Sequence, residues 1–533
     1  MLAVAIALLL ALPIVIVAAS VLQPAGEAWR HIADTLLVRY TANTALLVAL
    51  VACGVMSIGV VSAWLVANYR FPGVRVLEWA LVLPLAMPAY VMAYAYTDWL
   101  QVAGPVQGAL RSLSGWGARD YWFPEIRSLG GAAVVLSFAL YPYVYLIARA
   151  AFHEMPRSAI EAGRLAGHGA WGSFWRVALP LARPAVAAGT ALALMETLAD
   201  FGTVSYFALE VFTTGIFKAW FGMGDATAAA QLATCLLGFV VVVLALERVT
   251  RGRSAYHATA PAKPVPPQRL RGARAVLASL ACALPVLMGF LLPAAILIGL
   301  AASSPEARAE VRLLALVGNS FTLSGLTALA AVLLAVALAY AARLSKSRIA
   351  AAANRVAALG YAVPGAVIAV GVLVPLGRLD NWLAGALEDL TGARMGLLFT
   401  GTIAALVYAL LVRFLAVALQ TTEAGLARIT PSMEDAARIL GASPSAALAR
   451  VHAPLMAPSL ATAALLVFVD VMKELPATFA LRPFNFDTLA VEAYHLAQDE
   501  RLAEAAVPSL VIVAVGLVPL ALLARRYFQA TRS

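Results

Sequence analysis

The residues of this sequence that could do chemistry are two pairs of acids inside otherwise apolar segments. Glu196 and Asp200 are four residues apart, as are Asp470 and Glu474, so each pair lies on one face of a helix. Ionisable side chains inside membrane-spanning segments are costly and indicate function. Because carboxylate oxygens suit a hard cation, we expect the four acids to attract one, with Lys473 weakening their field.

The second acid pair follows the first at a constant offset, from Glu196 to Asp470 and from Asp200 to Glu474. A repeat that relates the two pairs would make them face each other. A rise of about 1.5 Å per residue from Pro184 puts Glu196 and Asp200 roughly 18–24 Å along their helix, past the midplane of a bilayer. Two further interpretations stay open. The acids could lie in water at helix ends, where a charge costs little, or could pair locally with Lys473.

The elements that position these acids are predicted from apolar runs. The chain has 533 residues, of which 62% are hydrophobic and only 12% charged, so the bilayer is its main solvent. A spanning helix needs about 20 mostly apolar residues. Twelve runs qualify, starting near Leu2, Ala42, Leu77, Leu129, Pro184, Ala226, Ala275, Ser320, Val356, Gly396, Pro458 and Val507. The sequence therefore predicts an all-α polytopic membrane protein with about 12 transmembrane helices.

Basic residues gather in the loops on the same side as the two termini, and acidic residues gather in the opposite loops. The positive-inside rule then places both termini of this multi-pass membrane protein in the cytoplasm. The net charge of +10 is explained by this topology. The expected partner is therefore the lipid bilayer, and the positive charge does not indicate binding to a nucleic acid.

Single residues within the spans carry further expectations. Pro84 and Pro88 should bend the third span, and Pro364 the ninth. Arg413 should extend from the cytoplasmic end of the tenth span to the membrane surface. The three cysteines and six histidines show no ligand spacing, so neither a metal site nor a cofactor is expected.

One cytoplasmic loop occurs twice. Residues 161–180 read EAGRLAGHGAWGSFWRVALP, and residues 435–454 read DAARILGASPSAALARVHAP. The matched positions keep the same offset as the acid pairs: Glu161 with Asp435, Gly167 with Gly441, and Pro180 with Pro454. A repeat step that crosses the membrane an even number of times makes the halves parallel. We therefore divide the chain into a first half (1–247), a basic, Pro-rich cytoplasmic linker (248–273) and a second half (274–533).

The repeated loop has the features of a docking element shown twice. An acid near a helix start favours the helix dipole, small residues allow a partner to approach closely, and glycine supplies a C-terminal turn. The residues concerned are Glu161, Ala162, Gly163 and Gly167 in the first copy, and Asp435, Ala436, Ala437 and Gly441 in the second.

This loop resembles the EAA loop of ABC importer permeases, the cytoplasmic coupling helix that sits in a cleft of the ATPase subunit. Asp435 departs from the usual Glu, and Ala453 from the usual Leu. Residues 84–100, 195–207, 212–225 and 472–490 also resemble the fused-dimer permeases of iron(III) importers.

The resemblance implies a type I ABC importer permease fold in a bacterial inner (plasma) membrane. It also implies two copies of an ATPase subunit, a periplasmic iron-binding protein, and alternating access. The chain itself should not be an enzyme, since none of its four lysines follows a glycine as a P-loop requires. Thiamine, a polyamine or an oxyanion such as sulfate is the alternative cargo, although the paired acids argue against an anion. An ATPase-independent secondary transporter is the third alternative, against which the duplicated loop argues.

Overall fold

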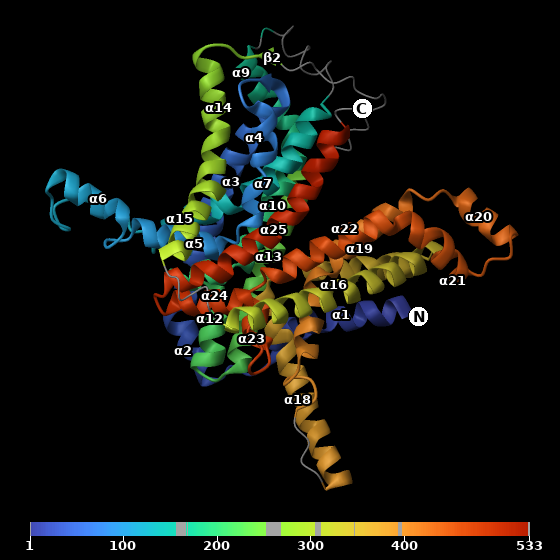
Figure 1. Ribbon diagram of the computed structural model, residues 1–533. Coiled ribbons are helices and arrows are strands. Elements are labelled where there is room, and N and C mark those ends of the chain that lie inside the picture. The colour runs from blue at the N-terminus through green and yellow to red at the C-terminus, as the bar shows by residue number, and fades with distance from the viewer. Residues whose placement is uncertain are drawn as a thin grey trace. The chain divides into compact units, whose positions relative to one another are not determined.

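The computed structural model describes residues 2–155, 167, 169–251, 268–303, 311–345, 347–392 and 397–530. Most of these residues are helical (Figure 1). One short parallel pair of strands joins β1 (Tyr69–Arg70) to β2 (Gln268–Arg269). The all-α class is therefore confirmed. Most of the predicted linker lies outside the described residues.

Eleven helices among the described residues are long and apolar enough to cross a membrane, and the count is twelve if one bent pair is a single span. The bent pair joins Val74–Ala86 to Ala89–Ser114 at an angle of 94°. Pro84 lies in its first segment and Pro88 directly precedes the second. The predicted number of about 12 spans agrees with this count, and the bend in the third is confirmed. Pro364 instead marks a helix start.

The chain forms two compact units, each of which we describe by itself. Unit 1 comprises residues 1–31, 216–237 and 309–492. Its helices are α1 (Leu2–Ala19), η1 (Ser20–Leu22), η4 (Lys218–Gly222), α16 (Val311–Ser345), α17 (Arg348–Ala357), η7 (Ala358–Ala362), α18 (Gly365–Thr391), α19 (Ile403–Ala427), α20 (Pro431–Ile439), α21 (Pro444–Ala447), η8 (Leu448–His452), α22 (Ala453–Met472) and α23 (Pro476–Leu481).

Unit 2 comprises residues 32–215, 238–308 and 493–533. Its helices are α3 (Leu37–Asn68), α4 (Val74–Ala80), η2 (Leu83–Ala86), α5 (Ala89–Leu100), α6 (Pro105–Ser114), α7 (Leu129–His153), α9 (Ala170–Ser173), η3 (Phe174–Ala178), α10 (Leu179–Ala199), α11 (Gly202–Tyr206), α14 (Ala273–Val286), η5 (Leu287–Leu291), α15 (Leu292–Ser303) and α25 (Leu502–Ala530). Four helices contribute to both units: α2 (Glu27–Thr35), α12 (Phe212–Phe217), α13 (Ala226–Arg251) and α24 (Leu489–Gln498).

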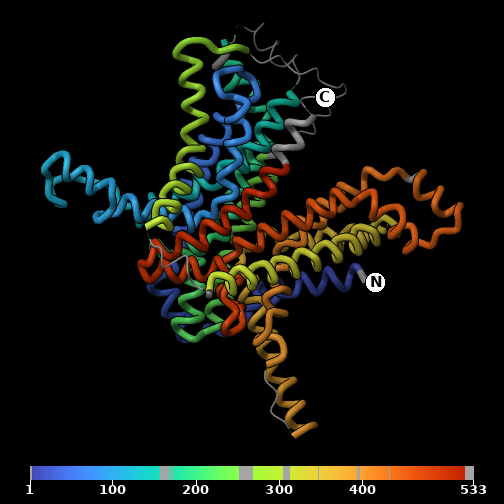
Figure 2. The backbone as a smooth tube through the Cα atoms, in the orientation of Figure 1, coloured from blue at the N-terminus to red at the C-terminus, as the bar shows by residue number. Residues whose placement is uncertain are grey.

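The first helix of each sequence half packs in the compact unit that is built mainly from the other half. Helix α1, from the start of the chain, packs in unit 1 against α17 and α18 (Figure 2). Helices α14 and α15, from the start of the second half, pack in unit 2 against α3, α4, α5 and α25. The predicted halves are therefore a division of the sequence that does not coincide with the compact units.

Small residues let the helices at the centre of unit 2 approach closely. A Cβ atom at Gly59 of α3 would lie 2.7 Å from the Cβ atom of Val144 in α7. A Cβ atom at Gly189 of α10 would lie 2.8 Å from the Cα atom of the same Val144. Small residues at such crossings are typical of membrane helix packing. In unit 1, Gly425 of α19 faces Ser459 of α22 in the same way.

We expect Gly59→Val to destabilise the fold because the added side chain meets the stiff Val144 side chain. Overpacking of this kind costs about 1–3 kcal/mol. The midpoint of thermal unfolding, measured on the purified protein in detergent, should fall. Gly299→Val is the matched control, since a Cβ atom there meets nothing within 4 Å. Equal midpoints for the two variants would contradict the packing.

Candidate functional site

Asp200 caps a short helix at the end of a spanning segment. It follows the last residue of α10, and α11 begins two residues later. Its carboxylate accepts hydrogen bonds from the N–H groups of Thr203 and Val204, both at 3.1 Å, and from the Thr203 hydroxyl at 3.0 Å. Helix starts leave such N–H groups unpaired. Burial raises the pKa of Asp200 to about 6, although the hydrogen bonds from Val204 and Thr203 lower it.

Glu474 makes the same cap in the second half, between α22 and α23. Its carboxylate accepts hydrogen bonds from the N–H groups of Ala477 and Thr478, both at 2.9 Å, and from the Thr478 hydroxyl at 2.7 Å. The repeat equates these two backbone donors with Thr203 and Val204 of the first half. One capping arrangement thus occurs twice, and it accounts for two of the four acids that the sequence singled out.

The cap at Glu474 has a buried cationic partner, Arg413, that the cap at Asp200 does not have. Nη1 of Arg413, in α19, lies 3.2 Å from Oε1 of Glu474, and the two side chains are 9% and 1% exposed. Gly365 leaves room for this pair, because a Cβ atom there would lie 2.5 Å from Nη1 and 2.7 Å from Oε1. The expectation that Arg413 extends to the membrane surface is wrong, because Glu474 compensates its charge inside the protein. Ala139 occupies the corresponding position in the first half.

The remaining two acids lie one turn earlier. Glu196 is half-buried in the last turn of α10. Oδ1 of Asp470, near the end of α22, lies 2.9 Å from Nζ of Lys473, and their side chains are 24% and 29% exposed. Local pairing with Lys473 is therefore observed for Asp470. Glu196 and Asp200 belong to unit 2, and Asp470 and Glu474 to unit 1.

Unit 2 contains a mainly apolar cavity of about 710 Å³ between α3, α10 and α13. Arg183, Thr190, Glu247 and Thr250 are its polar lining residues, and none of the four acids lines it. Apolar walls do not compensate the desolvation of a bare ion. Among the described residues, no group of three or more His, Cys, Asp or Glu could hold a metal ion.

A second duplicated arrangement was missed by the sequence analysis. In unit 2, the amide of Asn43 donates to the carbonyl oxygen of Glu210 at 2.9 Å, and the N–H group of Phe212 donates to Oγ1 of Thr44 at 3.3 Å. Nη1 of Arg39 lies 2.8 Å from the Glu210 carboxylate. These bonds fasten the segment after α11 to the first turns of α3.

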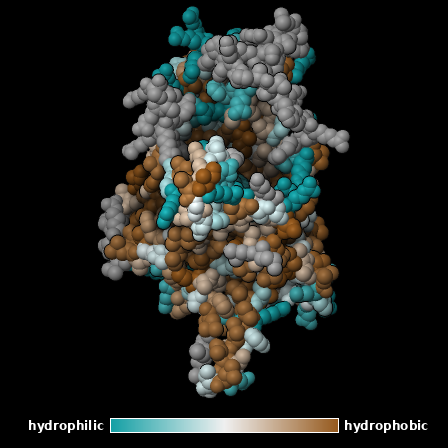
Figure 3. Space-filling model, turned by 90° about the vertical axis from the view of Figure 1, so that its right-hand side faces the viewer, coloured by the Kyte–Doolittle hydropathy of each residue, from teal (hydrophilic) through white to brown (hydrophobic). Residues whose placement is uncertain are grey.

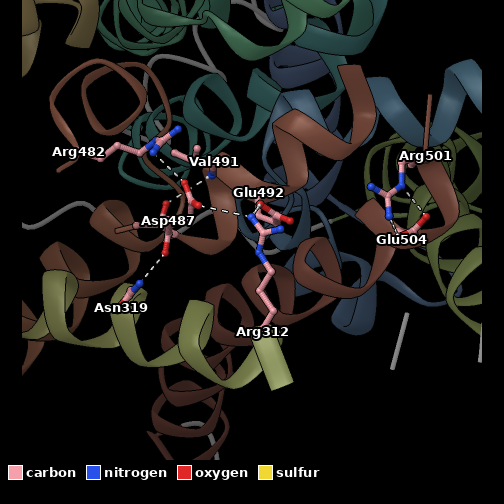
Figure 4. A network of polar contacts seen from close by, with 9 residues as sticks. Arg312, Asn319, Arg482, Asp487, Val491, Glu492, Arg501 and Glu504 are labelled. Atoms are coloured by element: carbon pink, nitrogen blue, oxygen red, sulfur yellow. Dashed lines mark hydrogen bonds and ion pairs between the residues drawn. The ribbon is translucent and has the colours of Figure 1, made fainter. Parts of the chain in front are cut away.

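The same fastening recurs in unit 1 (Figure 4). Asn319 donates to the carbonyl oxygen of Asp487 at 3.0 Å. The N–H group of Leu489 donates to Oγ of Ser320 at 2.8 Å. Arg482 lies 2.9 Å from the Asp487 carboxylate. The signal that would have found this pair is the dipeptide Asn-Thr in the first half and Asn-Ser in the second, at nearly the offset of the repeat.

Ion pairs strengthen this part of unit 1. Arg312, at the start of α16, places Nη2 3.0 Å from the carboxylate of Glu492 and 3.5 Å from that of Asp487 (Figure 4). Elsewhere in the same picture, Arg501 pairs with Glu504 in the first turn of α25. Ion pairs therefore stabilise the starts of α16 and α25.

The second copy of the repeated loop is a short helix with a glycine turn. Asp435, Ala436 and Ala437 lie in α20. Gly441 has φ +80°, its N–H group bonds to the carbonyl of Arg438 at 3.0 Å, and the N–H group of Ala442 bonds to that of Ala437 at 3.0 Å. This pairing is the Schellman motif. The predicted glycine turn is confirmed here.

The first copy of the loop shows the same glycine. Gly167 has φ +81°, almost the value of its counterpart Gly441. Glu161, Ala162 and Gly163 lie outside the described residues. Only φ values in this region favour glycine over other residues, which explains why the repeat keeps glycine at both positions.

The tip of the second loop carries apolar side chains that the sequence analysis did not single out. Ile439 and Leu440 are 86% and 87% exposed. Arg343, in the last turn of α16, fixes the base of the loop. It pairs with Glu434 at 3.1 Å and donates to the carbonyl oxygen of Ile429 at 2.8 Å. A fixed helix with an exposed apolar tip is suited to insertion into a partner's pocket.

Comparison with known proteins identifies the family. The model of the binding-protein-dependent transport system inner membrane component matches residues 56–252 and again residues 331–532. The Fe(3+)-transport system permease protein FbpB 2 of Haemophilus influenzae is 27% identical over 497 residues, which cover 91% of this chain and 90% of that protein.

Two shorter relatives match parts of the chain. The molybdenum transport system permease protein ModB of Escherichia coli is 28% identical over 37% of this chain and 87% of its own length. The probable sulfate transport system permease protein of Chlorokybus atmophyticus is 30% identical over 27% of this chain and 48% of its own length. Since the family model matches both halves and most of the sequence, the chain belongs to the family of binding-protein-dependent transport system inner membrane components.

Proposed function

We propose that this chain is the permease of an ATP-driven, binding-protein-dependent ABC importer whose cargo is iron(III). The observation that carries the proposal is the similarity to the Fe(3+)-transport permease, which runs through both halves and covers 91% of the chain. The chain is a transport subunit, and a separate ATPase subunit hydrolyses ATP. The family match argues against an ATPase-independent secondary transporter.

An oxyanion is the second candidate cargo, because relatives that transport sulfate and molybdenum align with 27% and 37% of the chain. The negative charge of the paired acids is a weaker argument against an anionic cargo than the sequence alone suggested, because basic side chains compensate part of it. In unit 1, Arg413 compensates Glu474 and Lys473 compensates Asp470. Neither thiamine nor a polyamine is favoured by a comparable observation.

The proposed mechanism is alternating access. A periplasmic iron-binding protein delivers the cargo to the outer face, and two copies of an ATPase subunit engage the repeated loops on the cytoplasmic face, where both termini also lie. Closure of the ATPase pair pulls on the loops and rocks the two halves. The exposed tip of α20 and its fixed base support this role, because force can pass only through a rigid connection.

The translocation path uses the acids that do not cap helices. Glu196 and Asp470 attract the cation, although Lys473 weakens the field of Asp470. Asp200 and Glu474 hold the turns that position them. The capping hydrogen bonds support this division of roles.

Deletion of the chain should abolish uptake of radiolabelled iron(III) by cells, because no other subunit forms the path. Uptake of molybdate, sulfate and thiamine is measured in parallel. The intact chain should restore iron uptake alone. Normal iron uptake together with a defect in molybdate or sulfate would replace iron with an oxyanion and leave the permease assignment standing.

Ile439→Asp with Leu440→Asp should abolish co-purification of the ATPase subunit, because two charges replace the apolar tip. Both side chains are exposed, so the unfolding midpoint should stay unchanged. Ser432→Asp is the matched control on the same helix, where a negative charge favours the helix start. Retention of the ATPase by the double variant would refute the docking role.

Glu196→Gln with Asp470→Asn should lower the initial rate of iron uptake about tenfold or more, if together they supply roughly 1.4 kcal/mol or more to cation entry. ATPase binding should be unaffected. Thr462→Val, which alters α22 at a partly exposed position two turns earlier, is the control. Unchanged uptake by the double variant would remove both acids from the path.

A further inference from the structure

The third span ends in a hairpin whose polar groups point inward. We call residues 101–127, which contain α6, the α6 hairpin. Gln107 is only 6% exposed, and Oε1 of its side chain accepts a hydrogen bond from the Tyr121 hydroxyl at 2.7 Å. Arg111 donates to the same hydroxyl at 3.1 Å and to the carbonyl oxygen of Val102 at 2.8 Å. The interior of this hairpin is therefore a hydrogen-bonded polar network.

The α6 hairpin exposes large apolar side chains beside polar ones. Leu113 is 88% exposed, Trp122 85% and Trp116 49%. Val106, Ala109 and Leu113 follow the spacing of one helix face. A hairpin surrounded by water has the opposite arrangement, with apolar groups inside and polar groups outside. Large exposed apolar side chains beside polar ones, over a polar interior, are typical of a segment that lies at a membrane surface.

A second hairpin, in unit 1, is built in the same way. We call residues 376–392 and 397–402, which contain the end of α18, the α18 hairpin. Asp380 is fully buried, and its carboxylate accepts hydrogen bonds from the N–H groups of Leu398 at 3.1 Å and Thr400 at 2.7 Å, and from the Thr400 hydroxyl at 2.6 Å. Trp382 and Leu390, by contrast, are 67% and 83% exposed.

Each hairpin projects from its own unit (Figure 1), and the surface of the α18 hairpin is largely hydrophobic (Figure 3). The bend of 94° in the third span turns α5 and α6 across the direction of the first segment. The α6 hairpin contains the end of the third span, and the α18 hairpin contains the end of the ninth. Because both numbers are odd, the order of the spans puts both hairpins on the membrane face opposite the termini.

We propose that the α6 and α18 hairpins lie in the interface of that outer leaflet and anchor the permease to it. Leu113, Trp122, Trp382 and Leu390 insert among the lipid headgroups and upper acyl chains. Tryptophan is enriched at this depth, and an amphipathic segment lies there with its apolar face buried. Both hairpins continue directly from spanning helices, so their apolar surfaces extend the lipid-facing surface of the protein. The proposal depends on the membrane fold and not on the cargo.

The test places a spin label at one position of the whole permease, reconstituted in liposomes. Cys53, Cys235 and Cys282 are first replaced by Ala, and gel-filtration behaviour and the midpoint of thermal unfolding check that this variant is folded. Cysteine is then introduced at Leu113 or Leu390. The matched controls are the exposed polar neighbours Ser112 and Asp389.

Collision rates with oxygen, which concentrates in the bilayer, are compared with those of a water-soluble nickel chelate. The oxygen-to-nickel ratio at Leu113 and Leu390 should exceed that at Ser112 and Asp389 several-fold. Ratios equal to the controls would overturn the proposal. So would ratios that rise only when the periplasmic binding protein is added, because the hairpins would then be a protein docking surface. If either variant fails to fold, Trp122→Cys and Trp382→Cys provide the same measurement.

Discussion

A helix that ends beside a bilayer leaves N–H and carbonyl groups that water does not reach, and the whole structure depends on how these groups are paired. Asp200 and Glu474 pair them where a spanning helix turns into a short one. Asn43 and Asn319 pair the carbonyl groups of the segments that follow. These capped breaks allow the chain to place short, non-spanning segments at the ends of its spans.

The two halves of the repeat are most alike at the residues that form hydrogen bonds to the backbone or set its turns. The caps, the Asn fastenings and the left-handed glycines recur at or close to one sequence offset, because each performs a local task that both halves share. The halves differ in the buried charges beside their helix caps. Arg413 has Ala139 as its counterpart, and so the cap at Glu474 is neutralised by an arginine that the cap at Asp200 does not have. This difference gives a fused permease two unequal halves, which two identical subunits would not have.

The proposed contacts with partners occur at opposite ends of the spans. On the side of the termini, α20 presents Ile439 and Leu440 from a base fixed by Arg343. On the opposite side, the α6 and α18 hairpins present tryptophan and leucine. A permease that rocks during transport needs such a division, since its loops must transmit force while its outer segments stay in contact with the bilayer.

The sequence alone determined the twelve spans, the repeat, the glycine turns and the family resemblance, because these depend on apolar length and on local hydrogen bonding. It located all four acids, but Asp200 and Glu474 are capping residues, a role that depends on where each helix stops. The tertiary structure decided the rest. Arg413 and Glu474 are far apart in the sequence and meet only because α19 packs against α22. The exchange of α1 between units and the inward polar groups of the hairpins likewise follow from packing, which hydropathy along the chain does not encode.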